Sequence, residues 1–225
     1  MLDIVYEDNH IIAVNKEPGD LVQGDKTGDK TLLDEVKNYI KKKYDKPGDV
    51  FLNPVHRLDR PVTGIVIFAR TSKALTRLNE IFKNRQIEKE YLAITEGRPK
   101  DFEATLVHYI VKDEQTNMVK AYDKEKKGGK RAELTYEMVG EMNEKSLLKV
   151  WPLTGRPHQI RAQLKKMGCP ILGDTKYGSM YKMDDRSICL HCHKMSFIHP
   201  VKKEKITIRA PKPETYPWLE FFVED

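Results

Sequence analysis

The chain has 225 residues, of which 39% are hydrophobic and 33% are charged. This length suits one large domain or two small ones, and the hydrophobic fraction is sufficient to form a core. A membrane span is not expected, because no run of about 18 apolar residues is present. The first residues also lack the basic and then apolar layout of a signal peptide, so we expect a cytoplasmic protein.

The formal net charge of the chain is +6 at pH 7. A basic balance favours a polyanionic partner such as a nucleic acid and speeds the encounter with it. The three cysteines, Cys169, Cys189 and Cys192, cannot all pair with one another. Without a secretory signal, this odd count indicates reduced thiols.

The first elements that the hydrophobic pattern predicts are a β-hairpin over residues 3–16 and a loop that continues to residue 20. Thr31 is placed to cap a helix, because apolar side chains recur at helical spacing from residue 32 to residue 40. The lysines at residues 41–43 suit the C-terminal end of that helix, where cations interact favourably with the helix dipole.

A short polar stretch, residues 56–64 (HRLDRPVTG), precedes an apolar, β-branched run at residues 65–69 (IVIFA). The run is typical of a buried strand. Pro61 and Gly64 are expected to fix a turn in front of it. The stretch therefore predicts a shaped loop at the start of a rigid element, which is a common place for chemistry.

Asp59 is the one carboxylate of this loop, and it lies between Arg57 and Arg60. Nearby cations favour the ionised form of an acid, which suits a nucleophile or an anionic anchor rather than a general acid. The alternative is a structural aspartate that caps the turn, with the two arginines as solvated surface charges.

The middle of the chain is predicted to contain a helix from a cap at Ser72 through Phe82, and then a strand over residues 88–94. Residues 98–130 are polar and rich in charge, so we expect a solvated loop region there; an RNA-facing finger is the alternative. Alternating patterns predict strands again at 133–139 and 146–151.

A second candidate constellation, residues 154–164 (TGRPHQIRAQL), is predicted to be a loop that turns into a helix ending near Gly168. Helical spacing places His158 and Arg161 on one face, away from the apolar residues. With Arg156 nearby, the helix start is a possible anion site that could hold a phosphate or pair with Asp59. The alternative is an amphipathic helix with an ordinary basic face.

A cluster of possible metal ligands occurs at Cys189, His191, Cys192 and His193. Their spacing is too tight for the usual paired zinc ligands, and no second pair follows. A strand whose side chains alternate between the inside and the outside explains the cluster better, so we expect no metal.

Several of these blocks, in this order, resemble the signatures of the RluA family of pseudouridine synthases. The resemblance spans roughly residues 3–209 and departs from the family pattern at residues 62–64, where Val-Thr-Gly replaces the usual Thr-Ser-Gly. The matching blocks are HRLD at 56–59, KEYLA at 89–93, GRPHQIR at 155–161, GCPILGD at 168–174, YG at 177–178, LH at 190–191 and FIHP at 197–200.

The resemblance implies an enzyme that isomerises uridine in RNA to pseudouridine, with Asp59 as the catalytic nucleophile. The sequence leaves open whether Asp59 attacks C1′ of the ribose or the uracil ring, or instead takes a proton from the ribose. By the same resemblance, Arg161 forms a salt bridge with Asp59, Tyr91 stacks on the target base, and Arg57 fills the space that the base vacates. Arg60, Arg156 and His158 are the other residues expected to contact RNA, and the basic residues 156–166, with Arg70 and Lys73, would hold phosphates.

The fold that the resemblance implies is α+β, with a central, mostly antiparallel sheet and flanking helices and loops around one catalytic cleft. We expect a single catalytic domain over residues 1–225, without the small RNA-binding domain of the S4 type that precedes it in many relatives. The partner is expected to be rRNA or tRNA, and the enzyme a monomer. Isomerisation needs no redox change or external energy, so no cofactor is expected, and no nucleotide-binding glycine motif is present.

Two other functions remain open at this point. A catalytically silent RNA-binding protein on the same fold would share the basic surface but would not need Asp59. A metal-dependent RNA nuclease usually needs clustered acids, whereas the motif region has one isolated aspartate.

Overall fold

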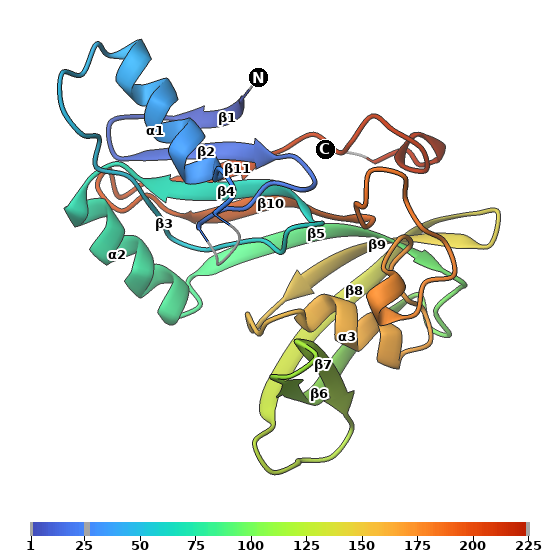
Figure 1. Cartoon of the computed structure of the whole chain (residues 1–225). Helices are drawn as coiled ribbons and strands as arrows, with labels where there is room; N and C mark the ends of the chain where they lie inside the picture. The colour runs from blue at the N-terminus through green and yellow to red at the C-terminus, as the bar shows by residue number, and fades with distance from the viewer. Residues whose placement is uncertain (1, 25–27, 224–225) are drawn as a thin grey trace. The chain divides into compact units, whose positions relative to one another are not determined.

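The computed structural model describes residues 2–24 and 28–223 (Figure 1). The chain divides into two compact units, of which unit 1 comprises residues up to Lys89 and Cys192–Pro211, and unit 2 the remainder. Two of the boundaries fall within strands, one in β5 (Ile87–Glu96) and one in β10 (Leu190–Ile198). Strands and helices are mixed in the way the sequence predicts, and the α+β class is confirmed.

Unit 1 is built on strands in the order β1-β2-β4-β10, of which β1 and β2, and β2 and β4, pair antiparallel. The predicted hairpin is confirmed, with Ile4 of β1 opposite Val14 of β2. The predicted strand at 65–69 is also confirmed, and every residue of β4 is buried. The bounds are β1 Asp3–Glu7, β2 Ile11–Lys16, β3 Asn53–Pro54 (paired with β4), β4 Thr63–Ala69 and β11 Lys205–Arg209 (paired with β10).

Helices α1 (Leu32–Lys43) and α2 (Ser72–Lys83) belong to unit 1. Thr31 caps α1 as predicted and forms a capping box with Asp34, so two backbone N–H groups of the helix start are satisfied. The predicted cap of α2 at Ser72 is wrong by one residue. Thr71 has the extended backbone of a cap, and its hydroxyl accepts the Ala74 N–H at 3.2 Å, while Ser72 is already helical.

Unit 2 contains strands in the order β5-β9-β8-β6-β7, all antiparallel where the register is given. The strands predicted at 133–139 and 146–151 are confirmed and extend further than predicted. The bounds are β6 Glu103–Asp113, β7 Met118–Tyr122, β8 Lys130–Met142, β9 Lys145–Pro152, α3 Gln159–Lys166, and the short 3-10 helices η1 Thr175–Tyr177 and η2 Trp218–Glu220.

The prediction of a solvated loop over residues 98–130 is wrong for most of that range, because β6 and β7 form a hairpin there (Figure 1). One face of this hairpin is apolar, and its Ile110 and Val119 pack in a core cluster with Ala162 of α3. The dense charges of the segment obscured this alternation. Outside the two strands, residues 98, 100–102, 114–117 and 123–128 are exposed, as predicted.

Strand β10 is confirmed where the sequence indicated a strand, but its side chains do not alternate between a buried and an exposed face. Residues 190–193 are all buried, which is typical of a strand covered on both faces. Among the described residues, no helix is both long and apolar enough to cross a membrane.

Candidate active site

Asp59 lies in unit 1, on the loop between β3 and β4, and is half-buried. The Val62 N–H donates to the Asp59 carbonyl at 3.0 Å and closes a tight turn just after the carboxylate. On the other side, the Gly19 N–H donates to the Arg60 carbonyl at 2.9 Å. One hydrogen bond within the loop and one from Gly19 therefore fix the backbone that carries Asp59.

Lys16, the last residue of β2, supports this loop from inside the unit. Its ammonium donates to the carbonyls of Arg60 at 3.0 Å and Val62 at 2.8 Å, and also to the Glu17 carbonyl at 2.8 Å. Lys16 is only 1% exposed, and burial lowers the pKa of its ammonium to about 8, against the opposing attraction of Asp20 and Asp59. The sequence analysis placed Lys16 where the predicted hairpin passes into a loop and gave it no role.

Gly64 has a different role from the turn that the sequence predicted. It lies within β4 with φ of +109°, a conformation that other residues rarely adopt. A Cβ at this position would collide with the backbone of Cys192 in β10. Glycine is thus needed because two strands approach closely directly after the Asp59 loop.

His56, at the start of the motif, is structural. Its Nε2 accepts the Ile67 N–H at 3.1 Å, and its ring stacks on Phe82 with centroids 5.2 Å apart. Burial, together with the nearby Lys89 cation, lowers the pKa of His56 to about 3. The imidazole therefore stays neutral and helps to hold the loop against β4.

The arginines expected to contact RNA differ in their availability. Arg57 is exposed, and Arg60 is half exposed while it bonds the Gly19 carbonyl at 2.9 Å and Asp29 at 3.0 Å. Arg70 is not available: its side chain is 10% exposed, pairs with Glu7 at 3.1 Å and stacks on Tyr44. The prediction that Arg70 holds an RNA phosphate is therefore wrong.

The second predicted constellation lies in unit 2 and begins with a network around Gln159. The Gln159 side-chain oxygen accepts from the Thr154 hydroxyl at 2.7 Å and the Arg156 N–H at 3.0 Å. Its amide nitrogen donates to the Glu133 carbonyl of β8 at 3.0 Å. The loop before α3 is thereby tied to the sheet, with Arg156 half-buried at its edge.

Arg161 is buried, so it does not form part of an ordinary basic face of α3, which was the alternative interpretation of the sequence. It is 5% exposed and makes a bidentate ion pair with Asp174, from Nε to Oδ2 at 2.7 Å and from Nη2 to Oδ1 at 2.8 Å. Its guanidinium also lies over the Tyr177 ring, 4.8 Å from the centroid. The sequence analysis included Asp174 and Tyr177 in two separate matching blocks but gave neither residue a role.

His158 and Tyr91 complete the predicted set in unit 2. His158 precedes α3 in a left-handed conformation, and its Nδ1 is 2.8 Å from the Tyr177 hydroxyl. Tyr91 is half-buried on β5, opposite Val150 of β9. The predicted site residues thus fall into two groups: Arg57, Asp59 and Arg60 in unit 1, and Tyr91, Arg156, His158 and Arg161 in unit 2. The pairing of Asp59 with Arg161 stays a prediction.

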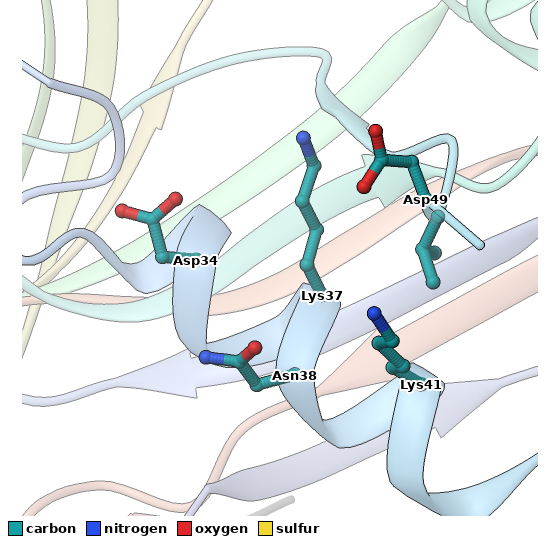
Figure 2. Close-up of a pocket in the computed structure, with 6 residues that line it drawn as sticks. Asp34, Lys37, Asn38, Lys41 and Asp49 are labelled. Carbon is teal, nitrogen blue, oxygen red and sulfur yellow. The ribbon is translucent and has the colours of Figure 1, made fainter. Parts of the chain in front are cut away.

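A separate surface hollow with a cavity volume of about 340 Å³ lies beside α1 in unit 1 (Figure 2). None of the predicted site residues lines it. Its lining combines charges of both signs, with Lys37 and Lys41 near Asp34 and Asp49. Five of its six lining residues are polar or charged, so it offers little apolar surface for a flat base, and we do not assign the reaction to it.

A family model for RNA pseudouridylate synthases matches residues 10–166, a range that includes Asp59, Tyr91 and Arg161. The chain belongs to this family. Its members isomerise uridine to pseudouridine within RNA, and this chain is accordingly an RNA pseudouridine synthase.

Curated relatives agree with this assignment over almost the whole synthase. It is 33% identical to tRNA pseudouridine synthase C of Haemophilus influenzae, covering 97% of this chain and 96% of that protein. It is 32% identical to the dual-specificity RNA pseudouridine synthase RluA of the same organism, covering 93% and 92%. Ribosomal large subunit pseudouridine synthase C of Buchnera aphidicola is 33% identical, covering 92% of this chain and 66% of that protein.

Solved structures support the fold. Human RNA pseudouridylate synthase domain containing 4 matches with a TM-score of 0.78 and 23% identity, covering 94% of the synthase and 89% of that chain. Human RNA pseudouridylate synthase domain containing 1 matches with a TM-score of 0.74 and 23% identity, covering 95% and 84%.

Proposed function

We propose that this synthase isomerises specific uridines in tRNA or rRNA, with Asp59 as its nucleophile. The observation that carries the proposal is the support of the Asp59 loop, whose backbone is held by Lys16 and by Gly19. A carboxylate on a loop fixed at several points is suited to a reaction that needs accurate placement. The choice of RNA follows the relatives, which are named for tRNA, for the large ribosomal subunit and for dual specificity.

The reaction leaves the composition of the RNA unchanged. The bond between N1 of uracil and C1′ of ribose breaks, the base turns, and a bond forms between C5 and C1′. The hydrogen leaves C5, and N1 gains one. Asp59 acts as the nucleophile while the glycosidic bond is broken, and no oxidant, reductant or energy source is consumed.

The other catalytic residues in the proposal are Arg161 and Tyr91. Arg161 would pair with Asp59 and keep its carboxylate ionised and oriented, as an opposite charge at short range does. Tyr91 would stack on the uracil and help to transfer a proton late in the reaction. The target base must first leave the RNA stack, at a cost of a few kcal/mol, and Arg57 would occupy the space that it leaves.

The RNA backbone would be held by the more exposed cations around these groups. Arg60 is favourable for this role because its ion pair with Asp29 is exposed, and such pairs contribute only about 0–1 kcal/mol. A phosphate can therefore replace Asp29 at little cost. Arg156 and His158 would bind RNA from the loop before α3, and phosphate contacts of this kind give affinity without sequence choice.

The direct test is release of tritium from RNA transcripts labelled at C5 of uridine, with EDTA present. Tritium release without strand cleavage supports the synthase and excludes a metal-dependent nuclease. Asp59→Asn should abolish release while RNA binding is largely retained. Asp184→Asn, an exposed change with the same loss of charge, is the control. Normal turnover by Asp59→Asn would end the nucleophile assignment.

We further propose that the synthase works as a cytoplasmic monomer without a cofactor. All the residues in the proposed site come from one chain, and the isomerisation requires no redox partner. The mass of the RNA-free protein, measured by light scattering after gel filtration, tests the monomer; a stable dimer would contradict it.

A further inference from the structure

The carboxylate of Asp174 binds a side chain of α3 instead of the backbone of the short helix that follows it. Asp174 directly precedes the short helix η1, where an aspartate side chain commonly accepts a backbone N–H of the helix start. Here it makes no such bond, and its two oxygens instead accept from Nε and Nη2 of Arg161 at 2.7 Å and 2.8 Å. With 1% exposure for Asp174 and 5% for Arg161, the pair is shielded from solvent.

The turn that carries Asp174 is itself fixed by backbone hydrogen bonds. The Asp174 N–H donates to the Ile171 carbonyl at 3.0 Å, and the Asp174 carbonyl accepts from Tyr177 at 2.9 Å and Ser179 at 3.1 Å. The carboxylate is therefore presented from a rigid support and has little freedom to follow a moving guanidinium.

Tyr177 restrains the same guanidinium from a second direction. Its ring lies under the guanidinium of Arg161, 4.8 Å from centroid to Cζ, and the side chain is 1% exposed. The hydroxyl accepts the Val119 N–H of β7 at 3.0 Å and is 2.8 Å from Nδ1 of His158. The ring is thus fixed to a strand at one end and to the start of α3 at the other.

We propose that Asp174 and Tyr177 are positioning residues that fix the plane of the Arg161 guanidinium for the isomerisation. This inference rests on the proposed function, in which Arg161 acts on Asp59. The bidentate pair sets the rotation of the guanidinium within its plane, and the ring below sets the tilt of that plane. Together they leave the long arginine side chain in one orientation before RNA arrives.

Stability alone is a weak explanation for this arrangement. A buried ion pair loses the hydration of both charges, and well-packed apolar residues in its place are often neutral or stabilising. Orientation explains it better, because a displacement of about 1 Å at a catalytic group can cost about 100-fold in rate. The expected signature is a change in kcat rather than in RNA affinity.

The first experiment compares Asp174→Asn with the wild type and with Asp184→Asn. Tritium release is measured at saturating RNA, and each rate is divided by the amount of protein that binds RNA in a titration. We expect kcat of Asp174→Asn to fall about 10- to 100-fold, with KM within about twofold, because the fork loses its charged partner. Asp184→Asn should match the wild type. The inference would be overturned if Asp174→Asn had the wild-type kcat per binding-competent molecule. It would also be overturned if the variant changed only KM.

A second pair of variants keeps the inference testable if Asp174→Asn does not fold. Tyr177→Leu removes the ring below Arg161, whereas Tyr177→Phe keeps the ring and removes only the hydroxyl. We expect kcat per binding-competent molecule to fall about 10-fold or more in Tyr177→Leu and less than about threefold in Tyr177→Phe. Equal rates for the two variants would contradict the role of the ring.

The two levels of failure are distinguishable by controls in the same assay. If the wild type releases no tritium from any RNA, or if Asp59→Asn is as active as the wild type, the proposed function fails. If the wild type is active and Asp59→Asn is inactive, but Asp174→Asn and Tyr177→Leu keep full kcat, only the positioning inference fails.

Discussion

The two units hold their proposed catalytic side chains with buried charges of opposite kinds. In unit 1 the loop of Asp59 is supported by the ammonium of Lys16, which donates only to neutral carbonyls. In unit 2 Arg161 is supported by the carboxylate of Asp174, an opposite charge in fork geometry. Neutral carbonyls offset only part of the free energy that an ammonium loses when it leaves water. Burial therefore lowers the pKa of Lys16 to about 8. Arginine stays protonated at any ordinary pH, so the second support is insensitive to alkali.

The sharpest way to break this comparison is to replace the fork of Arg161 by a point charge. Arg161→Lys keeps the charge but cannot reproduce the bidentate contact with Asp174 or the stacking on Tyr177. We expect a loss of about 100-fold or more in kcat, since both the pair and the orientation are disturbed. Tritium release at saturating RNA measures it. Arg98→Lys, at an exposed ion pair of the same unit, is the matched control.

A kcat for Arg161→Lys within about twofold of the wild type would count against the proposed pairing with Asp59. It would also count against a role for the bidentate contact with Asp174. A loss of the same size in Arg98→Lys would show instead that the assay responds to any arginine replacement in unit 2.

Several local elements of unit 1 were predictable because their signals lie close together in the chain. The capping box at Thr31, the hairpin over residues 3–16 and the buried strand after the Asp59 loop each depend on residues within a few positions of one another. The hairpin of β6 and β7 was missed because exposed charges on one face outweighed the apolar face in the composition.

The supports of the site were not predictable in the same way. Lys16 reaches a carbonyl 46 positions away at Val62, and nothing next to it in sequence indicates that contact. Asp174 is 13 positions from Arg161, and the helical spacing around Arg161 gave no indication of this ion pair. The proposed catalytic residues came from their sequence motifs, whereas the groups that hold them depend on tertiary contacts.

The second way to sharpen the comparison is to remove the ammonium of unit 1. Lys16→Met keeps most of the apolar stem and leaves three carbonyls without their donor. Each unsatisfied buried group costs about 1–3 kcal/mol, and partial access of water reduces the sum, so we expect a loss of about 3 kcal/mol in the free energy of unfolding. Urea denaturation measures it, with the exposed Lys46→Met as control. A variant as stable as the wild type would show that the carbonyls find other partners.

The smallest expected effect is a pH dependence that only the support in unit 1 should show. The pKa of Lys16 falls from 10.5 to about 8 on folding, so the folded protein releases this proton at lower pH than the unfolded chain does. Above about pH 8 the unfolded state therefore binds more protons, and the contribution of Lys16 to stability rises with pH until about pH 10.5. This rise amounts to about 2 kcal/mol between about pH 8 and about pH 10. Because other groups titrate in the same range, the quantity to measure is the difference in unfolding free energy between the wild type and Lys16→Met across that range. A difference that stays constant or shrinks as pH rises would show that the ammonium of Lys16 keeps its proton, and that the supports of the two units respond to pH alike.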